Sequence, residues 1–126
     1  MREMSKKIPK KLDKRSLAKH LKISVKAGQT KKAEDIVVLD LKDISSFTDY
    51  FIIMQGNSKR QNIAIYESIE KDLKNENIRP LSIEGRENAE WILMDYGYFI
   101  IHIFSKEARE YYYLEKLWGD APRTDY

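Results

Sequence analysis

The sequence Trp-Ile-Leu-Met-Asp-Tyr-Gly-Tyr-Phe-Ile-Ile-His-Ile-Phe-Ser, from Trp91 to Ser105, sets the architecture of this chain. It predicts two strands joined by a tight turn at Gly97, because glycine takes the positive φ that such a turn requires. Both strands carry apolar side chains on both faces, which is typical of strands covered on both sides. The rest of the chain must supply that cover. In the first strand Trp91, Leu93 and Asp95 face one way and Ile92, Met94 and Tyr96 the other; in the second, Phe99, Ile101 and Ile103 oppose Tyr98, Ile100, His102 and Phe104.

Length and composition restrict the class of protein. The chain has 126 residues, the size of one domain, and 42% of them are hydrophobic, which is enough for a modest core. It has no run of about 18 apolar residues and no apolar N-terminal segment, so we expect neither a membrane-spanning helix nor a secretory signal. Cysteine is absent, which excludes disulfides and thiolate metal sites and fits a reducing cytoplasm.

Charge is distributed unevenly along the chain. Residues 1–32 contain twelve Lys/Arg and two acidic residues, so the net charge of +3 divides into +10 for this segment and −7 for residues 33–126. Residues 1–11 predict a basic, disordered arm; a transit peptide is the alternative, and the scarcity of serine and of arginine argues against it. One interpretation is that the basic segment is simply solvated. The alternative is that it contacts a polyanion while the acidic residues 33–126 contact a basic surface.

Residues 12–126 predict a single α/β domain with the order α-β-β-α-β-β-β-α, a mixed five-stranded sheet with three helices. The narrow apolar stripes of the helices cover one face of the sheet well and the other only in part, and an exposed apolar face at Trp91 indicates a partner or oligomer site. The expected elements are a basic helix from Leu12 to a stop at Gly28 with the stripe Leu17, Leu21, Val25 and Ala18; strands Asp35–Leu41 and Tyr50–Gln55; a helix capped by Ser58 with Gln61, running to Asn75, with core side chains Ile65, Ile69 and Leu73; a strand Leu81–Glu84; the hairpin; and a helix Lys106–Trp118 capped by Ser105, with Tyr111, Leu114 and Trp118 on one side.

Residues able to carry catalysis are few. The two histidines, His20 and His102, lack the spacing of a zinc site, and we expect His102 to be a packed core residue with its ring satisfied. No glycine-rich phosphate loop occurs. Acids at strand ends can hold Mg²⁺ for nucleotidyl transfer, and this metal-dependent enzyme, using Asp40, Asp49 and Asp95, is an alternative hypothesis. However, no Asp-x-Asp occurs in residues 33–126, and Asp40 and Asp43 would point to opposite faces of a strand.

Aromatic residues indicate a binding surface. The run Tyr111–Tyr113 spans about 200° of a helix, so at least one of its rings faces solvent. Tyrosine and tryptophan bury large area at low entropic cost and are enriched among the residues that dominate protein interfaces. The aromatic side chains in excess of a small core are Tyr50, Trp91, Tyr96, Tyr98, Tyr111, Tyr112 and Tyr113.

A series of spaced motifs over residues 14–123 closely resembles the ribosomal silencing factor family, also called Iojap-like. Their order and number make the resemblance specific. The motifs are Asp40; Ser45-Ser46-Phe47-Thr48-Asp49-Tyr50-Phe51; Gly56-Asn57-Ser58-x-Arg60-Gln61; Glu84-Gly85; Trp91-Ile92-Leu93-Met94-Asp95-Tyr96-Gly97; His102-Ile103-Phe104; and Glu107-x-Arg109-Glu110-Tyr111-Tyr112-x-Leu114-Glu115-x-Leu117-Trp118-Gly119-Asp120-Ala121-Pro122.

The resemblance implies a non-enzymatic bacterial protein without cofactor or metal. Its fold would be shaped like a nucleotidyltransferase but lack the active site. It would bind the large ribosomal subunit through the universal ribosomal protein numbered fourteen, block joining of the small subunit and repress translation when nutrients are scarce. A role in late assembly of the large subunit and a homodimeric state off the ribosome are also implied. The family's partner-binding residues map to Trp91, Ile92, Asp95, Tyr96, Gly97, Asp49 and Tyr50.

Two features depart from the family pattern. Tyr98 stands where the family usually has a small polar or acidic residue, and the basic extension of residues 1–13 is longer than in most members. The family implies nothing for this extension. Our hypothesis is that it contacts ribosomal RNA as an independent arm, because counterion release drives basic segments onto phosphates. The candidate contacts are Lys6, Lys7, Lys10 and Lys11.

Overall fold

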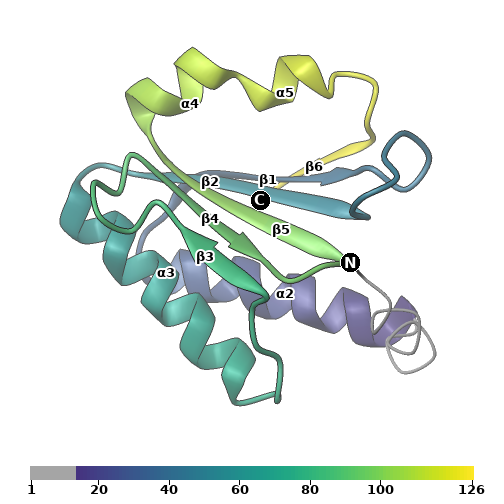
Figure 1. The fold of residues 1–126 in the computed structure, drawn as a ribbon, viewed down its shortest axis with the longest axis horizontal. Helices are drawn as coiled ribbons and strands as arrows, with labels where there is room; N and C mark the ends of the chain where they lie inside the picture. Colours follow the sequence, from purple (N-terminus) through teal and green to yellow (C-terminus); the bar gives the residue numbers. More distant parts are fainter. Residues whose placement is uncertain (1–13) are drawn as a thin grey trace.

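A computed structural model describes residues 14–126, with side chains from residue 17 onward, as a mixed sheet between two layers of helix (Figure 1). The arm of residues 1–11, with its four lysines, and the predicted helix start at Leu12 lie outside the described residues. No helix of the described part is long and apolar enough to cross a membrane. The elements are α2 (Lys14–Thr30), β1 (Glu34–Asp40), β2 (Tyr50–Gly56), α3 (Lys59–Lys74), β3 (Ser82–Glu84), β4 (Trp91–Asp95), β5 (Phe99–Ser105), α4 (Lys106–Tyr112), α5 (Leu114–Leu117) and β6 (Arg123–Asp125).

The sheet has the order β3-β4-β5-β2-β1-β6, in which β2 and β5 are parallel and every other pair is antiparallel. The predicted hairpin is confirmed: β4 pairs with β5, and Gly97 turns between them with φ +90°. The predicted count of five strands is corrected to six within residues 14–126. The additional strand, β6, has only three residues, all exposed, so it shows no alternation of apolar and polar side chains that sequence reasoning can use.

The first core lies between the sheet and the layer formed by α2 and α3 (Figure 1). The predicted stripe of α3 is confirmed, since Ile65, Ile69 and Leu73 are fully buried. The stripe of α2 is corrected, because Ala18 is exposed while His20 and Ser24 are buried. Ser24 is tolerated in the core because its hydroxyl donates to the His20 carbonyl of the preceding turn at 2.8 Å.

Gly28 does not end the first helix, as the sequence predicted, but lies within α2, two residues before its end at Thr30. A Cβ added at Gly28 would lie 2.7 Å from Sδ of the fully buried Met54 on β2. The glycine therefore lets helix and sheet approach each other closely, which is the second common reason for a glycine in a helix.

The second core lies between the opposite face of the sheet and α4 and α5. Here one predicted helix, Lys106–Trp118, is divided in two, because Tyr113 adopts a left-handed conformation with φ +46° and ends α4. The break turns Leu114 into the core, as expected, but leaves Tyr111 81% exposed, contrary to the predicted helix stripe. Of the helices in residues 14–126, α2 and α3 thus lie on one face of the sheet, and α4 and α5 lie on the other.

Both predicted N-caps are present. The Ser58 hydroxyl accepts from the Gln61 N–H at 3.0 Å, and the Ser105 hydroxyl accepts from the Ala108 N–H at 3.1 Å. The Gln61 side chain reaches back by one residue more than a standard capping box, because its Oε1 accepts from the N–H of Asn57 at 2.6 Å. Its Nε2 donates to the carbonyls of Lys31 and Lys32, so this residue also joins the start of α3 to the turn that follows α2.

Candidate protein-docking surface

The structure places the predicted site residues in two groups at opposite ends of β4. Trp91 pairs with Phe104, and Asp95, four residues further on, pairs with Ile100. At about 3.3 Å per residue, the two ends are about 13 Å apart. Asp49 and Tyr50 lie at the Asp95 end, since Tyr50 begins β2 opposite Phe99.

Trp91 is half-buried on the second-core side of the sheet, and its ring is held by three neighbours. Its Nε1–H donates to Nδ1 of His102 at 3.0 Å. Its ring centroid lies 4.5 Å from that of Tyr112 on α4 and 5.1 Å from that of Phe104. An indole whose polar atom is already bonded presents the rest of its surface as rigid apolar area, which is the property of an interface anchor.

His102 accepts the hydrogen bond from the Trp91 indole as a neutral imidazole. It is 3% exposed, and burial lowers its pKa to about 3. The ring is therefore uncharged at neutral pH, with Nδ1 available to accept the indole proton. The expectation of a packed core histidine is confirmed, but its ring is satisfied only in part, because Nε2 has no hydrogen-bond partner among the described residues.

At the other end of β4, the hairpin turn is bonded to the beginning of β2. The Gly97 N–H donates to Oδ1 of Asp95 at 2.8 Å, and the Thr48 hydroxyl donates to the Gly97 carbonyl at 3.0 Å. The N–H groups of Asp49 and Tyr50 both donate to the Tyr98 carbonyl, at 3.0 and 3.2 Å. The two motifs that the sequence separates by more than forty residues are thus one connected unit.

Three residues of the predicted set face inward. Ile92 is completely buried in the first core, and Gly97 is buried within the turn. Tyr96 stacks on Phe99 with ring centroids 5.0 Å apart and planes 8° apart, and burial raises the pKa of its hydroxyl. These residues can influence a partner only through the position of the backbone. Trp91, Asp95, Asp49 and Tyr50 are half-buried and reach the surface.

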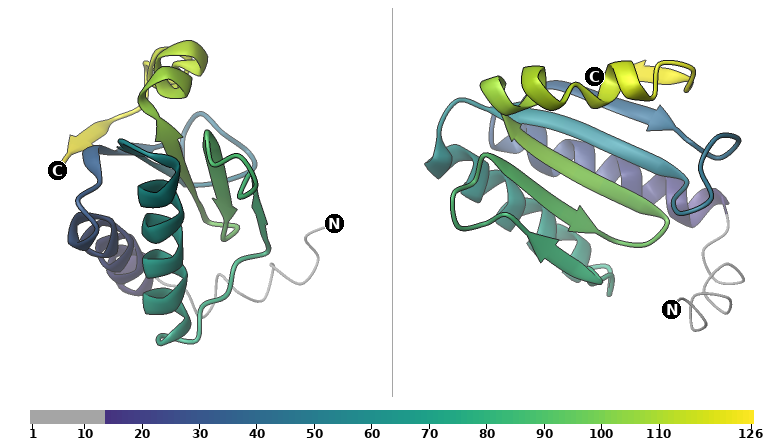
Figure 2. Two further views of the ribbon diagram at one scale, coloured as in Figure 1. Left: turned by 90° about the vertical axis from the view of Figure 1, so that its left-hand side faces the viewer. Right: turned by 45° about the horizontal axis from the view of Figure 1, so that its top comes forward.

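Sequence reasoning missed Leu93 as a member of this surface. Leu93 is half-buried on the same face of β4 as Trp91 and Asp95, and the alternation of the strand is the signal that identifies it. The face is open because α4 packs mainly on β5 and β2, whereas α3 packs on β4 from the opposite face of the sheet (Figure 2). We call Trp91, Leu93 and Asp95, with the adjoining Tyr112, the outer β4 face.

Acidic residues do not gather into a metal site in the described part of the chain: no three His, Cys, Asp or Glu side chains there are close enough together to hold an ion. Asp40 is engaged with Lys42, whose Nζ lies 3.6 Å from its Oδ2 and donates to the Tyr50 hydroxyl at 2.9 Å. Burial raises the pKa of Asp49. The arrangement of Asp40, Asp49 and Asp95 thus lacks the convergence that Mg²⁺-dependent nucleotidyl transfer requires.

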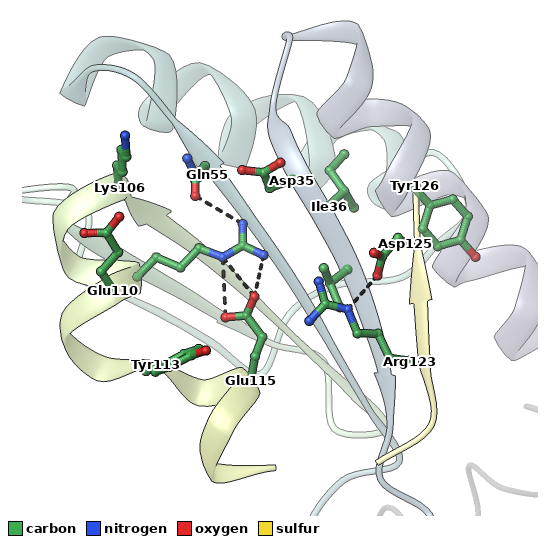
Figure 3. A pocket seen from close by; sticks show the side chains of 12 residues that line it. Asp35, Ile36, Gln55, Lys106, Glu110, Tyr113, Glu115, Arg123, Asp125 and Tyr126 are labelled. Carbon is green, nitrogen blue, oxygen red and sulfur yellow. Dashed lines mark hydrogen bonds and ion pairs between the residues drawn. The ribbon is translucent and has the colours of Figure 1, made fainter. Parts of the chain in front are cut away.

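A cavity of about 600 Å³ lies between α4, α5, β1, β2 and β6 (Figure 3). Its charged side chains are mostly paired with one another. Arg109 is buried, and its Nη2 contacts Glu115 Oε2 at 2.8 Å while Nη1 donates to Gln55 Oε1 at 3.3 Å. Arg123 pairs with Asp125 at 2.6 Å. The Arg109–Glu115 pair spans the break at Tyr113, so its evident effect is to hold α5 against α4.

The geometry defines an α/β protein with a mixed sheet, on one face of which Trp91 and Leu93 of β4 are only half-buried. A family model described as "Ribosomal silencing factor during starvation" matches residues 14–126. The chain belongs to this family of ribosomal silencing factors.

Individual relatives agree with the assignment. The chain is 46% identical over 105 residues to a ribosomal silencing factor of Bacillus subtilis, covering 83% of this chain and 89% of that protein. The crystal structure of a protein from Chromobacterium violaceum superposes with a TM-score of 0.79 at 32% identity, covering 81% of this chain and 85% of that one. A mouse protein named "Mitochondrial assembly of ribosomal large subunit protein 1" is 37% identical over 89 residues, 68% of this chain and 39% of its own length.

Proposed function

We propose that this protein is a non-catalytic factor that binds the large ribosomal subunit through the universal ribosomal protein numbered fourteen and prevents the small subunit from joining. Translation is thereby repressed under nutrient limitation, in a bacterial cytoplasm. The observation that supports the proposal is the outer β4 face, where Trp91 is half-buried and its indole N–H is held by His102. Interface hot spots are buried aromatic anchors of this kind surrounded by polar groups.

The proposed contact residues divide by their position in the fold. Trp91, Asp95, Asp49 and Tyr50 touch the partner, and Leu93 joins them as an apolar contact. Ile92, Tyr96 and Gly97 act indirectly, since their side chains or backbone are buried and set the position of β4 and its turn. The net charge of −7 on residues 33–126 assists encounter with a basic ribosomal protein.

Sedimentation of mixed ribosomal subunits tests the proposal. We expect saturating protein to decrease the joined-ribosome peak, the Trp91→Ala variant to fail, and the Leu117→Ala variant, which removes an exposed apolar side chain from α5, to behave like wild type. Unchanged subunit joining with wild-type protein bound to the large subunit would disprove the anti-association role.

A role in assembling the large subunit is a second candidate, supported by the printed name of the mouse relative. In that case, depleting the protein increases immature large-subunit particles in growing cells, whereas the anti-association role has its main effect on joined ribosomes during starvation. We also propose that lysines 6, 7, 10 and 11 of the arm contact ribosomal RNA.

We further propose that the free protein is a homodimer. A second copy would cover the open apolar side of the sheet until the ribosome replaces it. Light scattering on the free protein measures the mass, and a monomer at micromolar concentration would contradict this part of the proposal.

A further inference from the structure

Two helices of the same layer, α2 and α3, differ in the sign of their surface charge. Residues 14–32, which include α2, carry seven Lys/Arg and no acidic residue. Residues 59–74 of α3 carry four Lys/Arg and three acidic residues. Mixed charge is the ordinary pattern of a solvated helix, and α3 follows it. The single sign of α2 therefore needs a separate explanation.

The positive charges of α2 destabilise the helix. Its first turn holds no acidic residue to complement the helix dipole. Lys22 and Lys26 are both exposed and repel each other at the i, i+4 spacing. Among the described ion pairs only one uses a cation of α2, between Lys19 and Glu76 in the turn after α3, at 2.8 Å. A polyanion outside the fold would relieve this repulsion.

The side chains on the exposed face of α2 indicate which kind of polyanion it binds. The larger apolar side chains of α2 pack against the first core, Val25 completely and Leu17, Leu21 and Ile23 in part. The small Ala18 is exposed, and this leaves too little apolar surface to insert into a membrane. Residues 14–32 contain no Phe, Tyr or Trp, so the face has neither the anchors of a protein interface nor platforms for stacking bases. The exposed Lys19, Lys22 and Lys26 span about 10 Å of the helix and match a phosphate backbone instead.

We propose that the solvent face of α2, centred on Lys22 and Lys26 and extended by Lys31 and Lys32, binds the phosphate backbone of RNA without reading its sequence. This surface lies in the layer opposite to α4 and α5, so it is separate from the outer β4 face (Figure 1). One large RNA–protein particle can engage both. The proposal does not depend on the proposed function, because free RNA is sufficient to test it.

The experiment measures binding of the full chain to a fluorescent RNA hairpin with a 20-base-pair stem, at salt concentrations from 50 to 200 mM. Each lost phosphate contact reduces the slope of log K against log salt by about 0.7–0.9. We expect the Lys22→Gln/Lys26→Gln variant to reduce the slope by about 1.5 and to weaken binding at 50 mM salt by roughly 10- to 100-fold. A hairpin of scrambled sequence should bind equally well.

The matched control is Lys71→Gln/Lys74→Gln, which removes two exposed lysines from α3 in the same layer. It should leave the slope unchanged, and circular dichroism verifies that both variants are folded. A third variant changes lysines 6, 7, 10 and 11 of the arm to glutamine. If this variant reduces the slope of log K against log salt and the α2 variant does not, the contact belongs to the arm and the proposal is overturned. Equal affinity for polyglutamate would indicate that the ligand is an acidic protein rather than RNA, and would overturn the proposal.

Discussion

The two faces of the sheet are built from the same kinds of strand but are covered differently. On the first-core face, α2 and α3 bury Ile65, Ile69 and Leu73 completely. On the second-core face, α4 and α5 cover β5 and β2 and leave Trp91 and Leu93 of β4 half-buried. A closed face contributes mainly to stability, whereas an open apolar face remains available for a partner. Substitutions on the two faces should therefore separate folding from binding.

The largest effect is expected on the closed face. Ile69→Ala removes three carbons from a fully buried position, and large-to-small changes of this kind reduce the free energy of unfolding by about 4 kcal/mol. Urea unfolding measures the loss, and the exposed Lys71→Ala on the same helix is the control. A loss below about 1 kcal/mol would show that the first core is less closely packed than the structure indicates.

On the open face, Trp91→Ala should act mainly on binding. Removing a hot-spot tryptophan weakens association by at least 2 kcal/mol, or about 30-fold in Kd, whereas stability should fall by less than in Ile69→Ala because the ring is only half-buried. Co-sedimentation with large subunits measures the affinity. Wild-type affinity in a folded Trp91→Ala protein would remove Trp91 from the docking surface.

Acid should destabilise the protein through His102, which lies beneath Trp91 on the open face. Its pKa of about 3 in the fold lies below the unfolded value of 6.5, so the unfolded chain binds more protons and stability falls as the pH drops from 6.5 towards 3. By pH 5 the loss is about 2 kcal/mol. Urea unfolding at pH 7 and pH 5 measures it. His102→Gln, whose amide accepts the indole proton but does not titrate, should show a smaller difference; an equal pH dependence would assign the effect to other groups.

The smallest effect concerns the hydrogen bond that orients Trp91. Trp91→Phe keeps an aromatic ring but leaves Nδ1 of the buried His102 without its donor, which destabilises the protein by about 1 kcal/mol. Thermal unfolding measures this loss, and the double variant Trp91→Phe/His102→Leu should recover part of it. A double variant less stable than Trp91→Phe alone would show that His102 contributes mainly by packing.

Local patterns predicted much of this molecule correctly. The hairpin around Gly97, the core stripe of α3 and the caps at Ser58 and Ser105 depend on neighbouring residues, so they are visible in the sequence. The break at Tyr113 was not visible, because a buried pair between Arg109 and Glu115 accompanies it and no local signal marks it. Gly28 was misinterpreted for the same reason: Met54, a residue of a different element, explains it.

The candidate site shows the same division. Motif resemblance and aromatic content indicated Trp91, Asp95, Asp49 and Tyr50 from the sequence. Only the tertiary structure decided which of the predicted residues reach the surface, because the exposure of Ile92 and Tyr96 depends on helices that pack over them from elsewhere in the chain. The sequence by itself thus determined the order of elements up to α4, the family and the charge asymmetry. The packing of distant segments decided which face of the sheet stays open.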